Sequence, residues 1–354
     1  MSIYDSRQWT EDIDRTMKIV PELKKLAGHS VLITGATGLI GSSIVDLLIR
    51  YNESYEIPIF ILAGGRNENR MKVRFDPYFY KKYFRFFQYD ALKTGNSLPQ
   101  CVDYIIHGAG NAFPAVIVKE PVETMTANFI GLYELLQLAR ECGAKRVLYI
   151  SSSEVYGLKE GNKPYEEDEY GYIDLLSQRN SYSVSKRAAE TLCISYGTEY
   201  GIGTAIVRPG HIYGPTASEA DNRVSSFFSR EAAKGQDLVM KSDGSQLRSY
   251  CYCLDCASAI LKVLIFGENG CAYNISNPDS VISIEQMARL AAEAGGVRLI
   301  RQEASEEEQK GFNPMNNSSL NSARLLRLGW KGCFDARTGF FHTVKILKEM
   351  NTNA

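Results

Sequence analysis

The feature that most constrains the fold is an apolar run that leads directly into closely spaced glycines and then into an apolar-periodic segment. Residues 31–34 read VLIT and residues 42–50 read SSIVDLLIR, with GATGLIG between them. This order predicts a strand, a tight turn and a helix N-terminus. Glycines lack a Cβ atom, so a diphosphate can approach the backbone, where helix amides and the helix dipole favour negative charge. The spacing is GxxGxxG, not the GxGxxG of the standard dinucleotide fingerprint. The residues predicted to form this loop are Gly35, Thr37, Gly38, Leu39, Ile40 and Gly41.

The same alternation of strands and helices continues along the chain. The apolar runs VLIT, IFILA, YIIH, RVLYI and GTAIVRP read as buried parallel strands, and helical segments separate several of them. These repeats predict an α/β fold with a doubly wound parallel (Rossmann) sheet and a smaller C-terminal substrate lobe. The expected divisions are an N-terminal helical extension (1–30), a dinucleotide-binding domain (31–210) with a return segment near 248–266, and a lobe made mainly of 211–354.

Composition limits the partners and the compartment. The chain has 40 Lys+Arg against 41 Asp+Glu, so no basic field exists to attract nucleic acid or an anionic membrane. The N-terminus has no uninterrupted apolar core of the kind a signal peptide needs, and no run of about 18 apolar residues predicts a membrane span. Eight scattered cysteines are typical of a reducing cytoplasm, where we expect the protein to work. Cys253 and Cys256 have CxxC spacing without a second ligand pair, so we expect core residues and no metal site.

The ends of the next two strands bear on the choice of dinucleotide. The second strand ends in Ala63-Gly64-Gly65-Arg66-Asn67, which offers no acid to the ribose 2′-hydroxyl of NAD. Arg66 could instead bind the 2′-phosphate of NADP, or simply be a solvated arginine. The cofactor is therefore expected to be NAD or NADP. Asp90 and Ala91 follow the third strand and are expected to lie near the adenine.

A candidate catalytic group follows the strand RVLYI. Residues 151–157 read SSSEVYG, which places hydroxyls and a carboxylate at the carboxyl edge of the sheet, where open α/β folds bind ligands. Tyr182 and Lys186 lie one turn apart at the start of a predicted helix, so they share one face. A free phenol has a pKa of about 10, and positive charge from Lys186 and a nicotinamide ring would stabilise the phenolate. Tyr182 is therefore the predicted base.

Together these motifs resemble the extended short-chain dehydrogenase/reductases that modify nucleotide sugars. The resemblance runs from Val31 to about Trp330. It rests on GATGLIG, ANFIGLYELL with Asn128, SSSEVYG, YSVSK, RPGHIYGP, GSQLRSYCYCLDCASAI and the terminal LGW. It implies that Ser152 and Tyr182 contact the sugar 4-hydroxyl, that Lys186 holds the nicotinamide ribose, and that Asn128 supports the site.

The resemblance also bears on the reaction, which would begin with transient oxidation at C4. The related dehydratases carry an Asp-Glu pair where this chain has Ser153-Glu154, and Ser-Glu resembles the decarboxylases. Arg248 falls where a family arginine could meet a phosphate or carboxylate, and its lobe also carries Arg223. His211 stands where the family often has Asn, which implies an altered sugar site, although a packed histidine is the simpler interpretation.

We therefore expect a nucleotide-diphosphate hexuronate decarboxylase or a nucleotide-sugar 4-epimerase. Three alternatives stay open: a nucleotide-glucose 4,6-dehydratase, an NADPH-dependent ketone reductase, and a non-catalytic dinucleotide-binding protein. The helical segments ANFIGLYELLQLAREC and YSVSKRAAETLCISYGTEY carry apolar stripes, which predict a homodimer with a four-helix interface.

Overall fold

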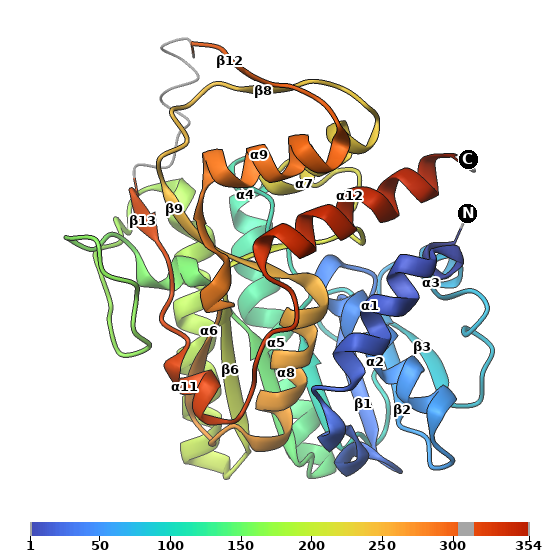
Figure 1. The fold of residues 1–354 in the computed structure, drawn as a ribbon. Helices are drawn as coiled ribbons and strands as arrows, with labels where there is room; N and C mark the ends of the chain where they lie inside the picture. The colour runs from blue at the N-terminus through green and yellow to red at the C-terminus, as the bar shows by residue number, and fades with distance from the viewer. Residues whose placement is uncertain (1, 304–314, 353–354) are drawn as a thin grey trace.

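The computed structural model describes residues 2–303 and 315–352 (Figure 1), and its centre is a sheet of seven parallel strands. In spatial order these strands are β10 (Cys271–Ile275), β6 (Thr204–Pro209), β5 (Arg146–Ile150), β4 (Tyr104–His107), β1 (Ser30–Thr34), β2 (Phe60–Gly65) and β3 (Phe84–Gln88). The order reverses at β1, as in a doubly wound fold, so the predicted fold class is confirmed. The edge strand β10 is not among the strands expected from the sequence.

Helices cover both faces of this sheet because alternate side chains of each strand point to opposite faces. Val31 and Ile33 of β1 belong to a buried cluster with α2 (Leu39–Ser54) and α8 (Cys253–Phe266). Leu32 lies between them in the chain and belongs to a second cluster. That cluster contains α5 (Pro121–Cys142) and α6 (Ser181–Tyr200). Strands buried on both faces explain the nearly continuous apolar runs in the sequence.

The C-terminal lobe gathers at one end of the sheet, at the top of Figure 1. A four-stranded sheet contains β9 (Leu247–Tyr252), which pairs with three short strands. Those strands are β7 (His211–Tyr213), β11 (Val281–Ser283) and β13 (Asn317–Ser318). A two-stranded sheet joins β8 (Leu238–Met240) and β12 (Leu299–Arg301), and the helices are α7 (Val224–Ala233), α9 (Ile284–Gly295) and α12 (Ala336–Thr352).

The structure divides the expected return segment 248–266 between the two sheets. Its first residues form β9, whose hydrogen bonds go to strands of the four-stranded sheet. Its remainder forms α8, which packs beside α2 against the main sheet. The chain then stays with the main sheet and adds β10, which pairs with β6. Cys253 and Cys256 are both buried in α8.

The N-terminal extension is helical and covers the cofactor domain. It consists of η1 (Ile3–Asp5), α1 (Arg7–Met17) and η2 (Pro21–Leu26). Trp9 and Ile13 are buried in the same cluster as α2 and α8, because they fall on one face of α1. Helix α1 also lies beside α12, as Figure 1 shows for the dark blue and red helices.

Short elements connect these layers. They are α3 (Glu68–Phe75), α4 (Pro114–Lys119), η3 (Ser153–Tyr156), η4 (Gln178–Asn180), η5 (Pro278–Ser280) and α11 (Ala323–Arg327). Over residues 2–303 and 315–352, the helices lack the length and apolar character that crossing a bilayer requires.

Candidate active site

The glycine loop between β1 and α2 has the geometry of a cradle. Gly35 has φ of +71°, and a Cβ there would lie 2.8 Å from the carbonyl oxygen of Gly108. A Cβ on Gly41 would overlap the carbonyl oxygen of Gly35. Helix α2 begins at Leu39 with Gly38 as its N-cap, and no side chain caps it. The first amides of α2 are therefore available to an anion, as the sequence predicts for a diphosphate.

The other predicted cofactor residues lie along the same edge of the sheet. Arg66 follows β2 and is exposed. Asp90 follows β3, and its carboxylate accepts a hydrogen bond from the amide of Leu92 at 3.2 Å. Ala91 is buried against Gly131 of α5. These positions agree with the order of the strands, but they leave the choice between NAD and NADP open.

Tyr182 and Lys186 lie on one face of α6, beside the end of β5. Both side chains are almost fully buried. The ammonium of Lys186 donates a 2.7 Å hydrogen bond to the carbonyl oxygen of Ile150 and lies 5.6 Å from the centroid of the Tyr182 ring. Tyr182 has a side-chain hydrogen bond with Ser152. The structure thus brings together Ser152 and Tyr182, which the resemblance assigns to the sugar 4-hydroxyl, and Lys186, which it assigns to the nicotinamide ribose.

Burial changes the pKa values of this pair in opposite directions, because it disfavours the charged form of each. The pKa of Tyr182 rises to about 12, mainly through burial and secondly through the charge of Glu154; Ser152 and Arg223 act against this. The pKa of Lys186 falls to about 7, mainly through burial, and the charge of Glu190 partly opposes the fall. From the sequence we expected Lys186 to lower the pKa of the phenol. In the structure its ammonium points to a backbone carbonyl instead.

Glu154 lies in η3, next to this group. Its carboxylate accepts a 3.2 Å hydrogen bond from the hydroxyl of Ser183, and its backbone amide donates to Ser152 Oγ at 3.2 Å. The residue is exposed to solvent, although many protein atoms surround its carboxylate. The loss of water raises the pKa of Glu154, while the Ser183 hydrogen bond and the charge of Arg179 lower it. Ser153, the residue between, is half-buried.

The turn that carries Glu154 is fixed at its far end by a buried polar network. Tyr156 donates a hydrogen bond to the side-chain oxygen of Asn274 in β10 and accepts one from Arg208 at 3.0 Å. Arg208 is buried and binds both carboxylate oxygens of Glu190, at 3.0 and 2.7 Å. Glu190 follows Lys186 by one turn of α6. The network therefore ties η3 to the helix that carries Tyr182.

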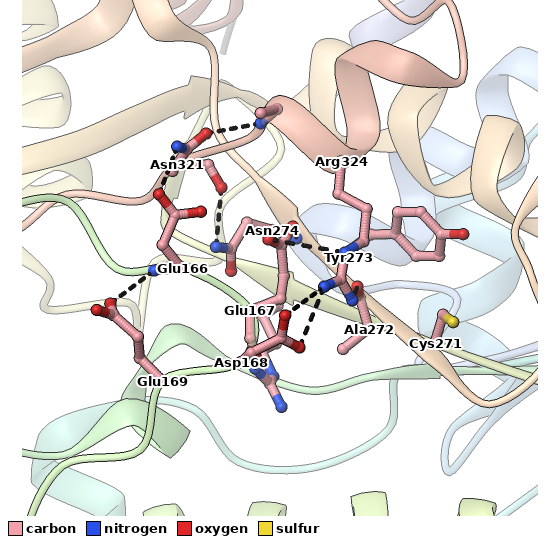
Figure 2. Close-up of polar contacts among 12 residues, drawn as sticks. Glu166, Glu167, Asp168, Glu169, Cys271, Ala272, Tyr273, Asn274, Asn321 and Arg324 are labelled. Atoms are coloured by element: carbon pink, nitrogen blue, oxygen red, sulfur yellow. Dashed lines mark hydrogen bonds and ion pairs between the residues drawn. The ribbon is translucent and has the colours of Figure 1, made fainter.

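The chain after this turn is attached to the same edge strand (Figure 2). Asn274 donates from its side chain to the carbonyl oxygens of Tyr165 and Asn321, at 3.0 and 2.9 Å. Its backbone amide donates to Glu167 at 3.0 Å. Arg324 of α11 binds the carboxylate of Asp168 at 3.0 and 3.1 Å. Because charged and amide groups satisfy one another here, the loop after η3 has a defined position.

Asn128 of α5 contacts the beginning of α6. Its side-chain nitrogen donates a 3.0 Å hydrogen bond to Ser185 Oγ, and Ser185 in turn donates to the carbonyl oxygen of Tyr182 at 2.9 Å. The side-chain oxygen of Asn128 is buried and has no partner within the described chain. The supporting position that the resemblance implies is therefore consistent with these contacts.

Three predicted substrate residues come from the C-terminal lobe. Arg223 is held by Asp221, whose carboxylate accepts bonds of 2.9 and 2.6 Å from its guanidinium. Arg248 is buried and donates to the carbonyl oxygens of Leu247 and Met315, at 2.8 and 3.1 Å. Burial, and then the charges of Arg248 and Arg223, lower the pKa of His211 to about 3. His211 is therefore neutral and lies close to both arginines, and Arg223 also acts on Tyr182.

The structure adds neighbours that the sequence analysis missed. Ser183 binds Glu154, the charge of Arg179 acts on Glu154, and the ring of Tyr149 lies under Lys186. A signal for two of them exists in the spacing, because residues 179, 182, 183 and 186 recur at the helical intervals that define one face. Tyr149 carries no such signal, since it reads as one more apolar residue of a strand.

Comparison with known proteins agrees with this arrangement. Residues 31–276 match the model of the NAD dependent epimerase/dehydratase family, which is more than half of the chain. The chain belongs to this family. The family resemblance stated from the sequence is thereby confirmed, and the protein is an NAD(P)-dependent enzyme.

Individual relatives include UDP-glucuronic acid decarboxylase 6 of Arabidopsis thaliana. It is 33% identical over 255 residues, 72% of this chain and 71% of the relative. UDP-glucuronic acid decarboxylase 1 of Xenopus tropicalis is 29% identical over 323 residues, 90% of this chain and 72% of the relative. Among solved structures, the UDP-glucose 4-epimerase of Thermus thermophilus in complex with NAD has a TM-score of 0.73 at 23% identity. That match covers 90% of this chain and 99% of the epimerase and supports the fold.

The residues of this epimerase/dehydratase family member fit a dinucleotide. Glycine at positions 35 and 41 lets the loop close tightly against backbone oxygens, and the uncapped N-terminus of α2 offers its first amides to a diphosphate. Lys186 offers a buried ammonium at the far end of the same sheet edge, and Asn128 offers a buried oxygen without a partner in the described residues. Both are the kinds of group that hold a ribose or order the site around it.

Proposed function

We propose that this enzyme decarboxylates a nucleotide-diphosphate hexuronate, the class that includes UDP-glucuronic acid, by transient oxidation at C4. The observation that carries the proposal is Glu154, which follows Ser153 and lies beside Tyr182 with its carboxylate bound by Ser183. Its charge acts directly on Tyr182. The similarity to UDP-glucuronic acid decarboxylases over most of the chain supports the same reaction.

Tyr182, Ser152 and Lys186 would perform the oxidation. Bound NAD(P)⁺ supplies the hydride acceptor. Tyr182 takes the proton of the sugar 4-hydroxyl, Ser152 orients that hydroxyl, and the ammonium of Lys186 keeps positive charge near the phenolate. The 4-keto sugar with a carboxylate at C6 is a β-keto acid, so the bond to that carboxylate breaks and carbon dioxide leaves.

Glu154 would act after the ketone exists, near C5. Loss of carbon dioxide leaves a carbanion-like centre at C5 that must take up a proton, and the carboxyl group of Glu154, whose pKa is raised by burial, can deliver one. Return of the hydride to C4 then completes the cycle. Elimination of water is disfavoured, because Ser153 has no acidic proton to give to a departing 6-hydroxyl.

The lobe residues are assigned to substrate binding. Arg248 would grip the diphosphate or the C6 carboxylate through its free guanidinium nitrogens, with Arg223 and His211 beside it. Arg66 would meet the 2′-phosphate if NADP is preferred over NAD, so titration with both cofactors decides that choice.

We also propose a homodimer that works in the cytoplasm. Helix α5 exposes Val122, Met125, Phe129 and Tyr133 at intervals of three and four residues, which form one apolar stripe. Helix α6 packs beside α5 and exposes Ile194. Two copies of this helix pair would form the expected four-helix interface. All eight cysteines are free thiols, as suits a reducing compartment.

The test is a product analysis of the purified protein with UDP-glucuronic acid and, separately, with UDP-glucose. We expect carbon dioxide and a nucleotide pentose from UDP-glucuronic acid, and nuclear magnetic resonance detects these products. Inversion at C4 without carbon dioxide would identify a 4-epimerase, and a 4-keto-6-deoxy product from UDP-glucose would identify a dehydratase. Reduction of simple ketones with NADPH, or cofactor binding without any turnover, would overturn the proposal in favour of a reductase or a non-catalytic protein.

A further inference from the structure

The ammonium of Lys186 lies between a backbone carbonyl and aromatic rings. It donates to the carbonyl oxygen of Ile150, and it lies 4.6 Å from the centroid of the Tyr149 ring. The ring of Tyr182 is farther away, at 5.6 Å. An ammonium within about 6 Å of a ring centroid and over its face is attracted by the negative face of the ring. The attraction is strongest where water is excluded, as it is here.

Tyr149 reaches this position from β5 and contributes its ring, not its hydroxyl. The side chain is fully buried, and its hydroxyl has no hydrogen-bond partner in the described part of the chain. The ring lies nearly parallel to that of His107, with 5.8 Å between centroids and 23° between planes. The Tyr149 ring therefore has both an imidazole and an ammonium as neighbours.

His107, whose ring stacks on the ring of Tyr149, is uncharged. Burial, and secondly the charge of Lys186, lower the pKa of His107 to about 3. The hydroxyl oxygen of Thr34 accepts bonds from the amides of Gly108 and Ala109, so its proton is free to go to His107 Nδ1, 2.7 Å away. His107 then carries its proton on Nε2, and no second positive charge competes with Lys186.

We propose that Tyr149 is a positioning residue for Lys186, whose ring face fixes the ammonium beside Tyr182 and favours its charged form. The role follows from the stack and from the contact distance, and it holds whichever sugar the enzyme takes. It deepens the proposed function, in which Lys186 must carry positive charge, but it concerns a property of the protein alone.

The sign of the effect on titration follows from the groups around Lys186. The titratable and charged groups near its ammonium are Tyr182, Glu190 and Cys193 on α6, Tyr149 on β5 and His107 on β4. Burial lowers the pKa of Lys186 to about 7, and attraction to the ring opposes this fall. Removing the attraction lowers the pKa further, so Lys186 loses its charge at a lower pH.

The experiment compares wild type with three replacements of Tyr149. Tyr149→Phe keeps the ring, Tyr149→Leu removes it, and a trifluorinated phenylalanine keeps its size while weakening its negative face. The titration of Lys186 is followed by nuclear magnetic resonance of lysine labelled with carbon-13 at Cε, and loss of the signal in Lys186→Met assigns it. No substrate is needed, so this measurement does not depend on the proposed reaction.

The expected titration midpoints of Lys186 distinguish the effect of the negative ring face at position 149 from the effect of side-chain size. Tyr149→Phe titrates like wild type, whereas Tyr149→Leu and the fluorinated variant titrate about 0.5 to 1.5 pH units lower. Equal midpoints in all variants would overturn the proposal, as would a shift in Tyr149→Phe as large as that in Tyr149→Leu. Thermal melting identifies a variant that fails to fold, and the fluorinated ring keeps the test decisive if Tyr149→Leu is one.

Discussion

Burial acts on neighbouring residues of α6 in opposite directions, and this asymmetry decides how the site must be charged. Tyr182 is held neutral, with a pKa raised to about 12, while the pKa of Lys186 falls to about 7. Lys186 is then only partly charged at neutral pH, and the Tyr182 phenol is not a base there. The phenol becomes one only when positive charge enters the site, which a nicotinamide ring in its oxidised form provides.

Tyr182→Phe tests this role. The change removes only the proton-transfer oxygen, so we expect turnover to be abolished while the affinities for cofactor and substrate stay nearly unchanged. Steady-state kinetics and calorimetry measure the two properties. Turnover at the wild-type rate would exclude Tyr182 as the base.

Glu154→Gln separates the later step from the oxidation. The amide keeps the shape of the side chain but removes the ionisable carboxyl group, so the hydride should still leave C4 while proton transfer to C5 fails. We expect the absorbance of reduced nicotinamide to rise on mixing with substrate and then to persist. A variant that never forms reduced cofactor would place Glu154 in the oxidation, and normal turnover would indicate a plain 4-epimerase.

Arg179→Ala tests the electrostatics of Glu154. The charge of Arg179 lowers the pKa of Glu154 against the effect of burial, so its removal should raise that pKa. The proposed step needs protonated Glu154, which is present below this pKa and is lost as pH rises through it, so the alkaline limb of the rate profile should move to higher pH in the variant. Arg7→Ala, at an exposed position of α1, is the control and should leave the limb in place. If the limb does not move in Arg179→Ala, the charge of Arg179 does not control the titration of Glu154.

At the scale of elements, the glycine loop determines where α2 begins and how its first amides are presented to a diphosphate. Gly41→Ala would push a methyl group into the carbonyl oxygen of Gly35. Overpacking of this kind costs about 1–3 kcal/mol, so cofactor affinity should fall about 5- to 100-fold. Gly197→Ala is the matched control in α6, because its Cβ would meet nothing nearer than 3.4 Å. Fluorescence titration with the cofactor measures both, and equal affinities would show that the loop tolerates a side chain.

Elements with strong local patterns could be predicted from the sequence, and elements that depend on distant partners could not. Apolar periodicity and turn residues predict the strand, glycine loop and helix at 31–50. The spacing of Tyr182 and Lys186 predicts that they lie on one face of a helix. The edge strand β10 reads CAYNI, which is short and polar at its centre, and it becomes a strand only because β6 offers it hydrogen bonds. The same holds for Tyr149, whose role appears only when α6 is packed over β5.

At the scale of the whole molecule, the apolar stripe on α5 is a feature that a single copy of the chain leaves exposed. Phe129→Asp would place a charge in the centre of the proposed interface, so we expect a monomer where wild type is a dimer. Val73→Asp, at an exposed position of α3, should leave the mass unchanged. Light scattering at micromolar concentration distinguishes the outcomes. A monomeric wild type, or a Phe129→Asp variant of unchanged mass, would refute this interface.

The N-terminal helix has a consequence for the time course of synthesis. Asp12 of α1 is buried, and its carboxylate lies 2.8 Å from His342 Nδ1 in α12, while Ser6 donates a hydrogen bond to Glu349. Translation at about 5–20 residues per second needs roughly 15 to 70 s to reach α12 after α1 has been made. During that interval the face of α1 that contacts α12 in the folded protein lacks this contact. A ribosome that pauses before α12 has been made therefore holds a chain in which the contacts of Asp12 and Ser6 with α12 cannot yet form.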